Sequence, residues 1–206
     1  MSWRWDAKTR RYRAGTGRFL SEKQVRTLRD RFVAAQAAEA TALAGKLAAG
    51  DLTVKAWETA MRALIRSTYL AEYALGRGGA NAMTDADYRL LGKALRQQYG
   101  YLRGFARDVA AGNHTEAGIA NRAGLYVQAS RQAHERGKAA AWGVDLPAYP
   151  GDGSTSCKAN CSCGWRLSET KTAYRATWVL GGSEHCDDCA GRAAAWSPFM
   201  VEKEAG

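Results

Sequence analysis

The segment that decides the C-terminal fold begins Cys157-Lys-Ala-Asn-Cys161-Ser-Cys163-Gly-Trp165 and ends Glu184-His185-Cys186-Asp-Asp-Cys189. It holds all five cysteines of the chain. Two thiol clusters separated by a hairpin-sized insert are typical of a four-ligand zinc site, because each cluster supplies ligands from one side and the insert folds back to join them. The sequence therefore predicts one Zn²⁺ site, whose candidate ligands are Cys157, Cys161, Cys163, Cys186 and Cys189.

The two clusters differ in how clearly they assign their ligands. Cys186 and Cys189 have the two-residue gap of zinc knuckles, whereas the first cluster offers three thiols where two are needed. Cys157 and Cys161 can share a tetrahedral site with less strain than Cys161 and Cys163 can. Cys163 stays open as a ligand, and so does His185. Because four protein ligands close the coordination shell, we expect the zinc to be structural and to leave no position for a reacting water.

Two other interpretations of the cysteines stay open. Disulfides are one, but the cysteine count is odd and the first residues lack the apolar run of a signal peptide, so a reducing compartment is expected. A catalytic pair of Cys186 with His185 is the other, but neighbours in sequence rarely point at one another. The sequence contains no His-Glu-x-x-His motif and no nucleophile elbow. We therefore predict that the chain is not an enzyme and has no small-molecule substrate.

A short β-hairpin is predicted between the clusters. Residues 164–167 lead into a polar turn at 168–171, and residues 173–180 then alternate and stop at two glycines. Tyr174, Ala176, Trp178 and Leu180 would share one face of the second strand. This module is too small to build a large core alone. Three tryptophans are expected to cover it: Trp165, Trp178 and Trp196.

The composition indicates a folded, mainly helical chain with an uneven charge. Its 206 residues are 46% hydrophobic and include only three prolines, which favours helix. No apolar run approaches the roughly 18 residues of a membrane span, so no membrane partner is expected. Residues 1–33 hold ten Lys/Arg against three Asp/Glu, a net charge of +7, whereas residues 151–206 hold six against seven, a net charge of −1. The N-terminal arm is therefore the main positively charged feature.

That arm contains a short repeat of aromatic-x-Ala-x-Thr-x-Arg-aromatic with a spacing of seven, which places Trp5, Tyr12 and Phe19 in register. Glycines at 15 and 17 and the lack of an apolar stripe count against a helical heptad, and short extended pieces with turns at 7–9 and 15–17 fit better. Such an arm could bind a protein surface, place arginines on phosphates, or be a solvated tail. The candidate binding residues are Arg4, Trp5, Lys8, Arg10, Arg11, Tyr12, Arg13, Arg18 and Phe19.

Four long helices are predicted between the arm and the cysteines. Each begins at a capping residue and ends near a glycine. The caps are Ser21, Thr53, Thr84 and Thr115, and the ends lie near Gly50, Gly76, Gly112 and Gly143. One face of the fourth helix, which includes Gly137, carries small side chains, so another helix could approach it closely. The predicted fold is mainly α: an arm at 1–20, a bundle of about four long helices at 21–143, and a small zinc-binding β-hairpin module at 144–206.

The order of these parts resembles the minor head proteins of tailed bacteriophages, in the Mu F-like head morphogenesis family, especially forms from phages of actinobacteria. The likeness spans nearly the whole chain, but only its cysteine portion is specific. It is carried by Trp5-Asp, Arg11-Tyr12-Arg13, Gly17-Arg18-Phe19-Leu20, helices ending near 139–142, Gly151-Asp-Gly-Ser-Thr155, Cys157, Asn160-Cys161-x-Cys163-x-Trp165, Glu184-His185-Cys186-x-x-Cys189 and Trp196-Ser-Pro198-Phe199.

The resemblance implies a non-catalytic virion protein, made in the host cytoplasm and placed in the capsid interior or at the portal vertex. Its partners would be the portal and/or the major capsid protein, and contact with packaged DNA is compatible with this role. The alternative prediction is a nucleic-acid-binding zinc protein whose basic arm contacts DNA phosphates, with binding that weakens steeply as salt rises. The nearly neutral cysteine segment counts against a nucleic-acid-reading role for the zinc module itself.

Overall fold

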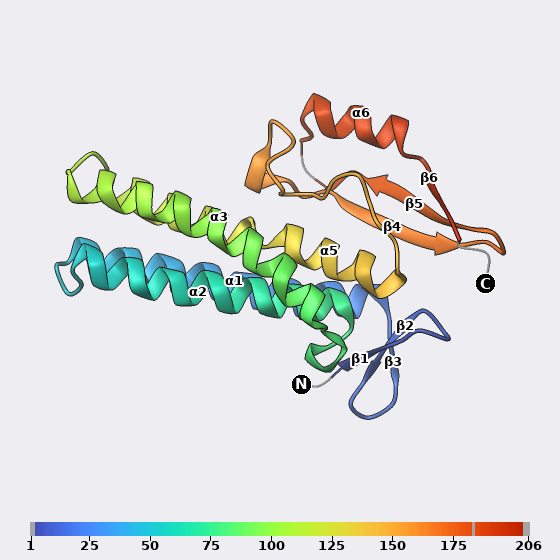
Figure 1. The fold of residues 1–206 in the computed structure, drawn as a ribbon. Coiled ribbons are helices and arrows are strands. Elements are labelled where there is room, and N and C mark those ends of the chain that lie inside the picture. Colours follow the sequence, from blue (N-terminus) through green and yellow to red (C-terminus); the bar gives the residue numbers. More distant parts are fainter. Residues whose placement is uncertain (1–2, 183, 204–206) are drawn as a thin grey trace.

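The computed structural model describes residues 3–182 and 184–203. Helices fill the span between residues 22 and 142, and two small antiparallel sheets lie near the same end of this helical part (Figure 1). The fold is thus mainly α, as predicted. The predicted segments 1–20 and 144–206 also include residues 1–2, 183 and 204–206, which lie outside the described residues.

Three long helices begin at the predicted caps. They are α1 (Glu22–Ala48), α2 (Val54–Arg77) and α3 (Asp85–Ala110). The Ser21 hydroxyl accepts a hydrogen bond from the backbone N–H of Gln24, and the side-chain oxygen of Gln24 accepts one from the backbone N–H of Ser21. Together these bonds satisfy two donors at the start of α1. The Thr53 and Thr84 hydroxyls likewise accept the backbone N–H three residues on, and at Thr84 the Asp87 carboxylate also accepts the backbone N–H of the cap. A connector containing the short 3-10 turn η1 (Ala80–Ala82) joins α2 to α3.

The predicted fourth helix is two helices, α4 (Glu116–Gln128) and α5 (Arg131–Trp142), so the bundle of about four long helices is not confirmed. Thr115 caps α4 as predicted, but the chain turns at residues 129–130. There Ser130 is fully buried and donates its hydroxyl to the carbonyl of Val127 at 2.6 Å. Because α4 packs along α1 and α5 packs along α2, the turn passes the chain from one partner helix to the other.

The crossing of α2 and α5 is very close. A Cβ on Gly76 would lie 2.1 Å from the carbonyl oxygen of His134, and a Cβ on Gly137 would lie 2.3 Å from that of Tyr73. No side chain fits at those distances, so only glycine allows the two backbones to approach in this way. The expected close approach of another helix at Gly137 is confirmed.

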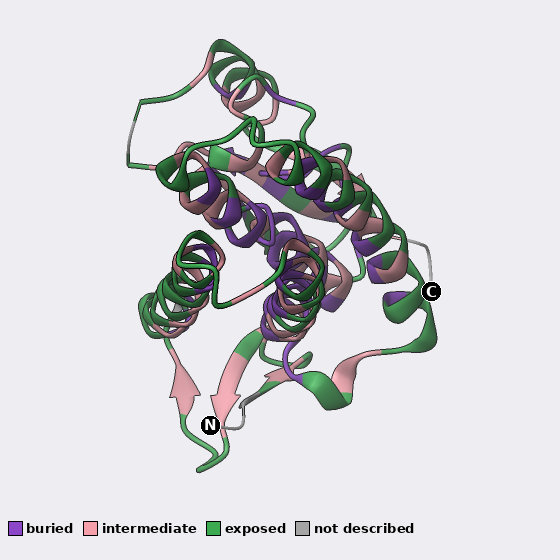
Figure 2. Ribbon diagram, turned by 90° about the vertical axis from the view of Figure 1, so that its left-hand side faces the viewer, coloured by how far each residue is buried: buried purple, intermediate pink, exposed green. Residues whose placement is uncertain are grey.

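Buried residues line the inward faces of the helices (Figure 2). Among the helices, the largest side chains that are enclosed completely come from α2 and α3, and include Trp57, Met61, Tyr69 and Leu102. The core also encloses an ion pair, in which Nε of Arg29 on α1 donates to the carboxylate of Glu72 on α2 at 2.8 Å. Burial raises the pKa of Glu72, although the charge of Arg29 opposes this.

The N-terminal segment is folded and docked. Strands β1 (Trp3–Asp6), β2 (Arg11–Ala14) and β3 (Phe19–Leu20) form an antiparallel sheet in that order, which confirms the extended pieces separated by turns. The backbone N–H of Trp5 donates to the carbonyl of Gly78 at 2.8 Å, and the Tyr12 hydroxyl donates to that of Gly76 at 2.6 Å. These bonds attach the sheet to the C-terminal end of α2.

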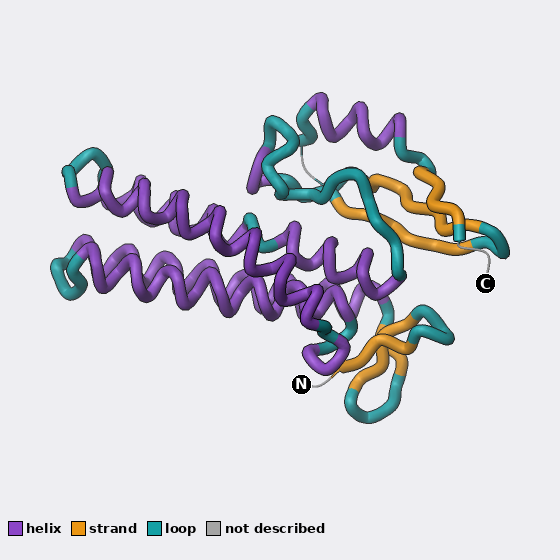
Figure 3. Tube along the Cα trace, viewed as in Figure 1, coloured by secondary structure: helices purple, strands orange, loops and turns teal. Residues whose placement is uncertain are grey.

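The C-terminal segment forms a second antiparallel sheet covered by a helix (Figure 3). After the turn η2 (Lys158–Asn160) come β4 (Gly164–Glu169), β5 (Ala173–Val179), α6 (Asp187–Ala195) and β6 (Phe199–Glu202). The predicted hairpin is β4–β5, with Trp165 opposite Trp178. The third strand and α6 were not predicted, and β6 pairs with β5 on the side away from β4.

Candidate metal centre

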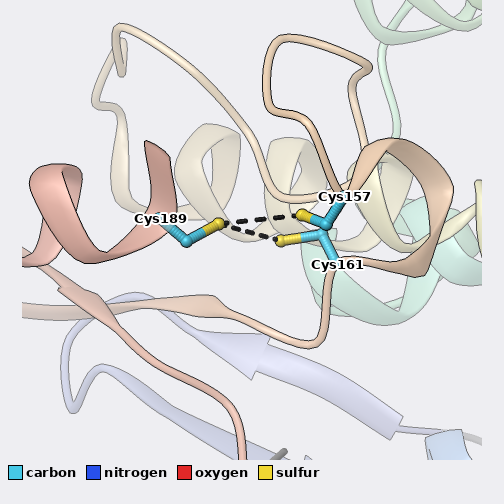
Figure 4. Close-up of side chains that lie close together, drawn as sticks. All are labelled: Cys157, Cys161 and Cys189. Carbon is cyan, nitrogen blue, oxygen red and sulfur yellow. Dashed lines mark hydrogen bonds between the residues drawn. The ribbon is translucent and has the colours of Figure 1, made fainter. Parts of the chain in front are cut away.

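Three thiols converge between the η2 turn and α6. Cys157 and Cys161 lie on either side of η2 and point toward Cys189, which faces them from α6 (Figure 4). The Sγ atom of Cys189 lies 3.8 Å from that of Cys157 and 3.7 Å from that of Cys161. All three sulfurs lie within 4.8 Å of one another, and this group can hold a metal ion. The predicted meeting of the two sequence clusters is therefore observed.

The spacing of these sulfurs fits a tetrahedral thiolate site. Zinc–sulfur bonds of about 2.3 Å at tetrahedral angles place neighbouring sulfurs about 3.8 Å apart. The two shortest separations match that edge, whereas a disulfide would bring two sulfurs to about 2.05 Å. All five cysteines are free thiols in the structure. The donor set and its spacing therefore fit a metal ion such as zinc better than a covalent bridge.

The sulfurs of the remaining two cysteines, Cys163 and Cys186, are not in the group that lies within 4.8 Å among the described residues. The Cys186 side chain interacts with that of Cys157, and both Cys186 and Cys163 interact with Cys189. Burial raises the pKa of Cys161 to about 12 and also raises that of Cys189. For Cys186 burial acts in the same direction, but hydrogen bonds from Ser156, Cys189 and Cys157 outweigh it and lower the pKa of the Cys186 thiol to about 6. A low thiol pKa favours the thiolate that binds metal.

Polar contacts tie the η2 loop to α6 independently of the thiols. The backbone N–H of Ser156 donates to the Asp188 carboxylate at 2.8 Å, and Arg192 donates to the carbonyl of Ser154 at 3.0 Å. The Thr155 hydroxyl lies 3.2 Å from the sulfur of Cys157. Because Asp188 and Arg192 both belong to α6, these hydrogen bonds join the loop that carries Cys157 and Cys161 to the helix that carries Cys189.

Trp165 fixes this module to the helical part. Its backbone N–H donates to the Glu135 carboxylate of α5 at 3.0 Å, and its backbone carbonyl accepts from Lys138, the residue that also pairs with Glu135 at 2.8 Å. Its indole Nε1 donates to the carbonyl of Ala148 at 2.9 Å. Burial would raise the pKa of Glu135, but Lys138 and the Trp165 N–H lower it to about 2. We name this set of contacts the Trp165 clasp.

The three tryptophans predicted to cover the module do pack together. Ring centroids lie 5.1 Å apart for Trp165 and Trp178, 5.4 Å for Trp165 and Trp196, and 5.8 Å for Trp178 and Trp196. The guanidinium of Arg192 lies 5.3 Å from the ring centroids of both Trp178 and Trp196. The same core cluster includes Cys161, Cys163 and Cys189, so the cover is continuous with the thiols.

His185 does not join the thiol group. It is exposed, in the stretch that leads into α6, and the metal-competent group found among the described residues consists of Cys157, Cys161 and Cys189. The sequence did not indicate Glu135 or Lys138, since neither belongs to a motif. The only sequence signal for these two residues was their spacing, because an acidic and a basic residue three positions apart on a helix can form an ion pair.

Several residues of the predicted binding arm make internal contacts. Arg10 pairs with Glu169 at 3.3 Å and lies 5.0 Å from the ring centroid of Trp142, while Arg13 pairs with Asp6 at 2.7 Å. Trp5 packs on Tyr12 at 4.9 Å. Arg11 and Arg13 both lie over the ring of Phe19. Arg4, Lys8 and Arg18 are exposed. Binding of a partner or of nucleic acid by this arm stays a prediction.

No protein-family model matches the chain, and no curated protein or solved structure matches it. Among the described residues, no helix combines the length and the apolar character needed to cross a bilayer.

Proposed function

We propose that the converging thiols hold one structural Zn²⁺ through Cys157, Cys161, Cys186 and Cys189. Two S–S separations at the edge length of a zinc–thiolate tetrahedron support this assignment. Cys186 is the fourth ligand, because it interacts with both Cys157 and Cys189 and shares the two-residue gap with the latter. Cys163 is then the spare thiol. Four thiolates complete the shell, so the ion has an architectural role.

We further propose that the chain is a minor head protein of a tailed phage, bound to the portal or the inner capsid during head assembly. The observation that carries this proposal is the convergence of the thiols at a site whose strand β4 is held on α5 by the Trp165 clasp. This arrangement joins a metal-centred module to a helical body and suits a structural component. The choice of family rests on the resemblance of the cysteine segment to that of phage minor head proteins.

The metal assignment is tested by elemental analysis and X-ray absorption on the purified chain. We expect about one zinc per chain with four sulfur neighbours at about 2.3 Å. Cys189→Ser and Cys186→Ser should both lose the metal, whereas Cys163→Ser and His185→Ala should retain it. Retention by Cys186→Ser together with loss by Cys163→Ser would exchange the roles of those two thiols. A fully loaded wild-type site with a nitrogen or exchangeable oxygen ligand would exclude the tetrathiolate.

The head-protein proposal is tested by co-expressing the chain with the portal and major capsid proteins of the genome that encodes it. Mass spectrometry of purified procapsids and portals should detect it at a few copies per particle, and Cys189→Ser should reduce its incorporation. Wild-type chain that is folded and loaded with metal, but absent from both procapsids and portals, would refute the proposal. The tetrathiolate assignment would survive that outcome.

A further inference from the structure

The outward face of α3 carries five cations in one row. They lie at steps of four, three, seven and four residues, which keeps them on a single face of an α-helix. All five are exposed, and among the residues that the structure describes none of them pairs with a carboxylate. The row consists of Arg89, Lys93, Arg96, Arg103 and Arg107, and we name it the α3 row.

The surroundings of the α3 row add cations and aromatic rings. Gly100 lies in the row between Arg96 and Arg103, and a Cβ there would meet nothing within 4 Å. Tyr101 beside the row is 53% exposed. On the flank toward α2, the guanidinium of Arg62 lies 5.1 Å from the ring centroid of Tyr99, and the exposed Arg66 interacts with the same tyrosine. Arg66 thus extends the positive surface from α3 to the adjoining part of α2, whereas the charge of Arg62 is balanced by Glu58.

Such a row does not stabilise the isolated chain. Like charges three or four residues apart on a helix repel each other by a few tenths of a kcal/mol per pair. Solvated helix faces usually mix the signs of charge instead, as α2 does where Arg62 pairs with Glu58 at 2.8 Å. The opposite face of α3 is fixed in the core by Leu91, Leu102 and their neighbours. The cations are therefore held outward on a rigid support, where an anionic partner would relieve their repulsion.

We propose that the α3 row binds the phosphate backbone of nucleic acid without regard to base sequence. From Arg89 to Arg107 the helix rises about 27 Å, a length of duplex axis that carries about eight phosphates on each strand at a rise of about 3.4 Å each. A straight row of exposed cations fits a linear array of charges, and the exposed Tyr101 suits contacts with sugars and bases. An acidic protein surface is the competing partner. This inference depends on neither the metal site nor the head-protein proposal.

The test is fluorescence anisotropy of a labelled 20-base-pair duplex titrated with the full chain at several salt concentrations. Five phosphate contacts predict that log K falls with log salt with a slope of about −4 to −5. The triple variant Arg96→Gln, Arg103→Gln and Arg107→Gln should reduce the slope by about 3 and weaken binding at least 100-fold at 50 mM salt. The control triple Arg4→Gln, Lys8→Gln and Arg18→Gln removes the same charge from the N-terminal sheet and should bind nearly as the wild type.

The outcomes separate the possibilities. Equal losses in both triples would mean that only net charge matters, and loss confined to the control triple would place binding on the N-terminal sheet; either result overturns the proposal. Binding of poly-glutamate with no binding of the duplex would identify an acidic protein partner instead, and also overturns it. Thermal unfolding of each variant checks that the fold is kept. Because these side chains are exposed, the α3 triple should be at least as stable as the wild type.

Discussion

Glu135 lies at the junction between α5 and the C-terminal module. Its carboxylate is buried, accepts the backbone N–H of Trp165, and pairs with Lys138. A polar group in such a place stabilises the fold only while each of its partners is present. The lowered pKa means that the charged carboxylate of Glu135 is more stable in the folded protein than in the unfolded chain.

The pH dependence of stability should therefore change in Glu135→Gln. The folded pKa of about 2 lies below the ordinary value of 4.5, so the stabilisation is complete above about pH 4.5 and is lost as the pH falls toward 2. We expect Glu135→Gln to lower the free energy of unfolding at pH 7 by roughly 3 kcal/mol, and by much less near pH 2. Chemical denaturation at several pH values measures this. Glu39→Gln, on the exposed face of α1, should follow the wild-type curve.

The Arg29–Glu72 pair makes a second prediction at the level of residues. Removing one partner of a buried ion pair leaves the other charge without compensation and costs about 3–5 kcal/mol. Glu72→Ala should therefore destabilise the fold by roughly that amount, measured by urea unfolding. Glu58→Ala removes half of a partly exposed pair on the same helix, that with Arg62, and should cost less than about 1 kcal/mol. Similar losses in the two variants would contradict the assigned role of burial.

Among the helices, the α2–α5 crossing gives the clearest prediction. Gly137→Ala places a methyl group 2.3 Å from the Tyr73 carbonyl oxygen, so the two helices must separate and the protein should lose several kcal/mol of stability. Gly124→Ala in α4 is the matched control, because a Cβ there meets nothing within 4 Å. It should raise stability by up to about 1 kcal/mol, since alanine favours helix over glycine. Thermal unfolding of both variants decides; a neutral Gly137→Ala would refute the close crossing.

The helices also show which features a sequence can predict. Ser21, Thr53, Thr84 and Thr115 cap their helices through hydrogen bonds to residues three positions on, so the starts could be predicted from local sequence. The turn at Ser130 could not, because residues 115–142 have a continuous helical pattern. The turn is decided by packing, since α4 lies on α1 and α5 lies on α2. The cysteine clusters were predictable from spacing alone, whereas the Trp165 clasp depends on Glu135 and Lys138, which belong to another segment.

At the scale of the whole molecule, the thiol site and the helices should respond differently to loss of metal. The helical core does not contain the thiols, and the cluster of Trp165, Trp178 and Trp196 adjoins them. A strong chelator should therefore change tryptophan fluorescence and expose the C-terminal module to proteolysis, while most far-UV helical signal remains. The Cys189→Ser variant should already resemble the chelated wild type. Complete loss of helix on chelation would show that the helical part cannot fold without the module.

The N-terminal sheet was the largest difference between expectation and structure. Its strands and turns were predicted, but its attachment to Gly78, Glu169 and Trp142 was not. Such contacts join positions far apart in the chain, and no local pattern encodes them. The basic arm was interpreted as a binding element because charge and aromatic content are visible in sequence, whereas the partner within the same chain is not.

The contact between Arg10 and Glu169 has a consequence for synthesis. These residues are separated by 159 positions, and a chain made at about 5–20 residues per second reaches the second on the order of 10 s after the first. Once residues 76–78 have been made, strands β1 and β2 can contact Gly76 and Gly78, but Glu169 is still to come. Docking of the N-terminal sheet on β4 must therefore wait until residue 169 has been made, and a cysteine-module variant that fails to fold should leave that sheet accessible to chaperones.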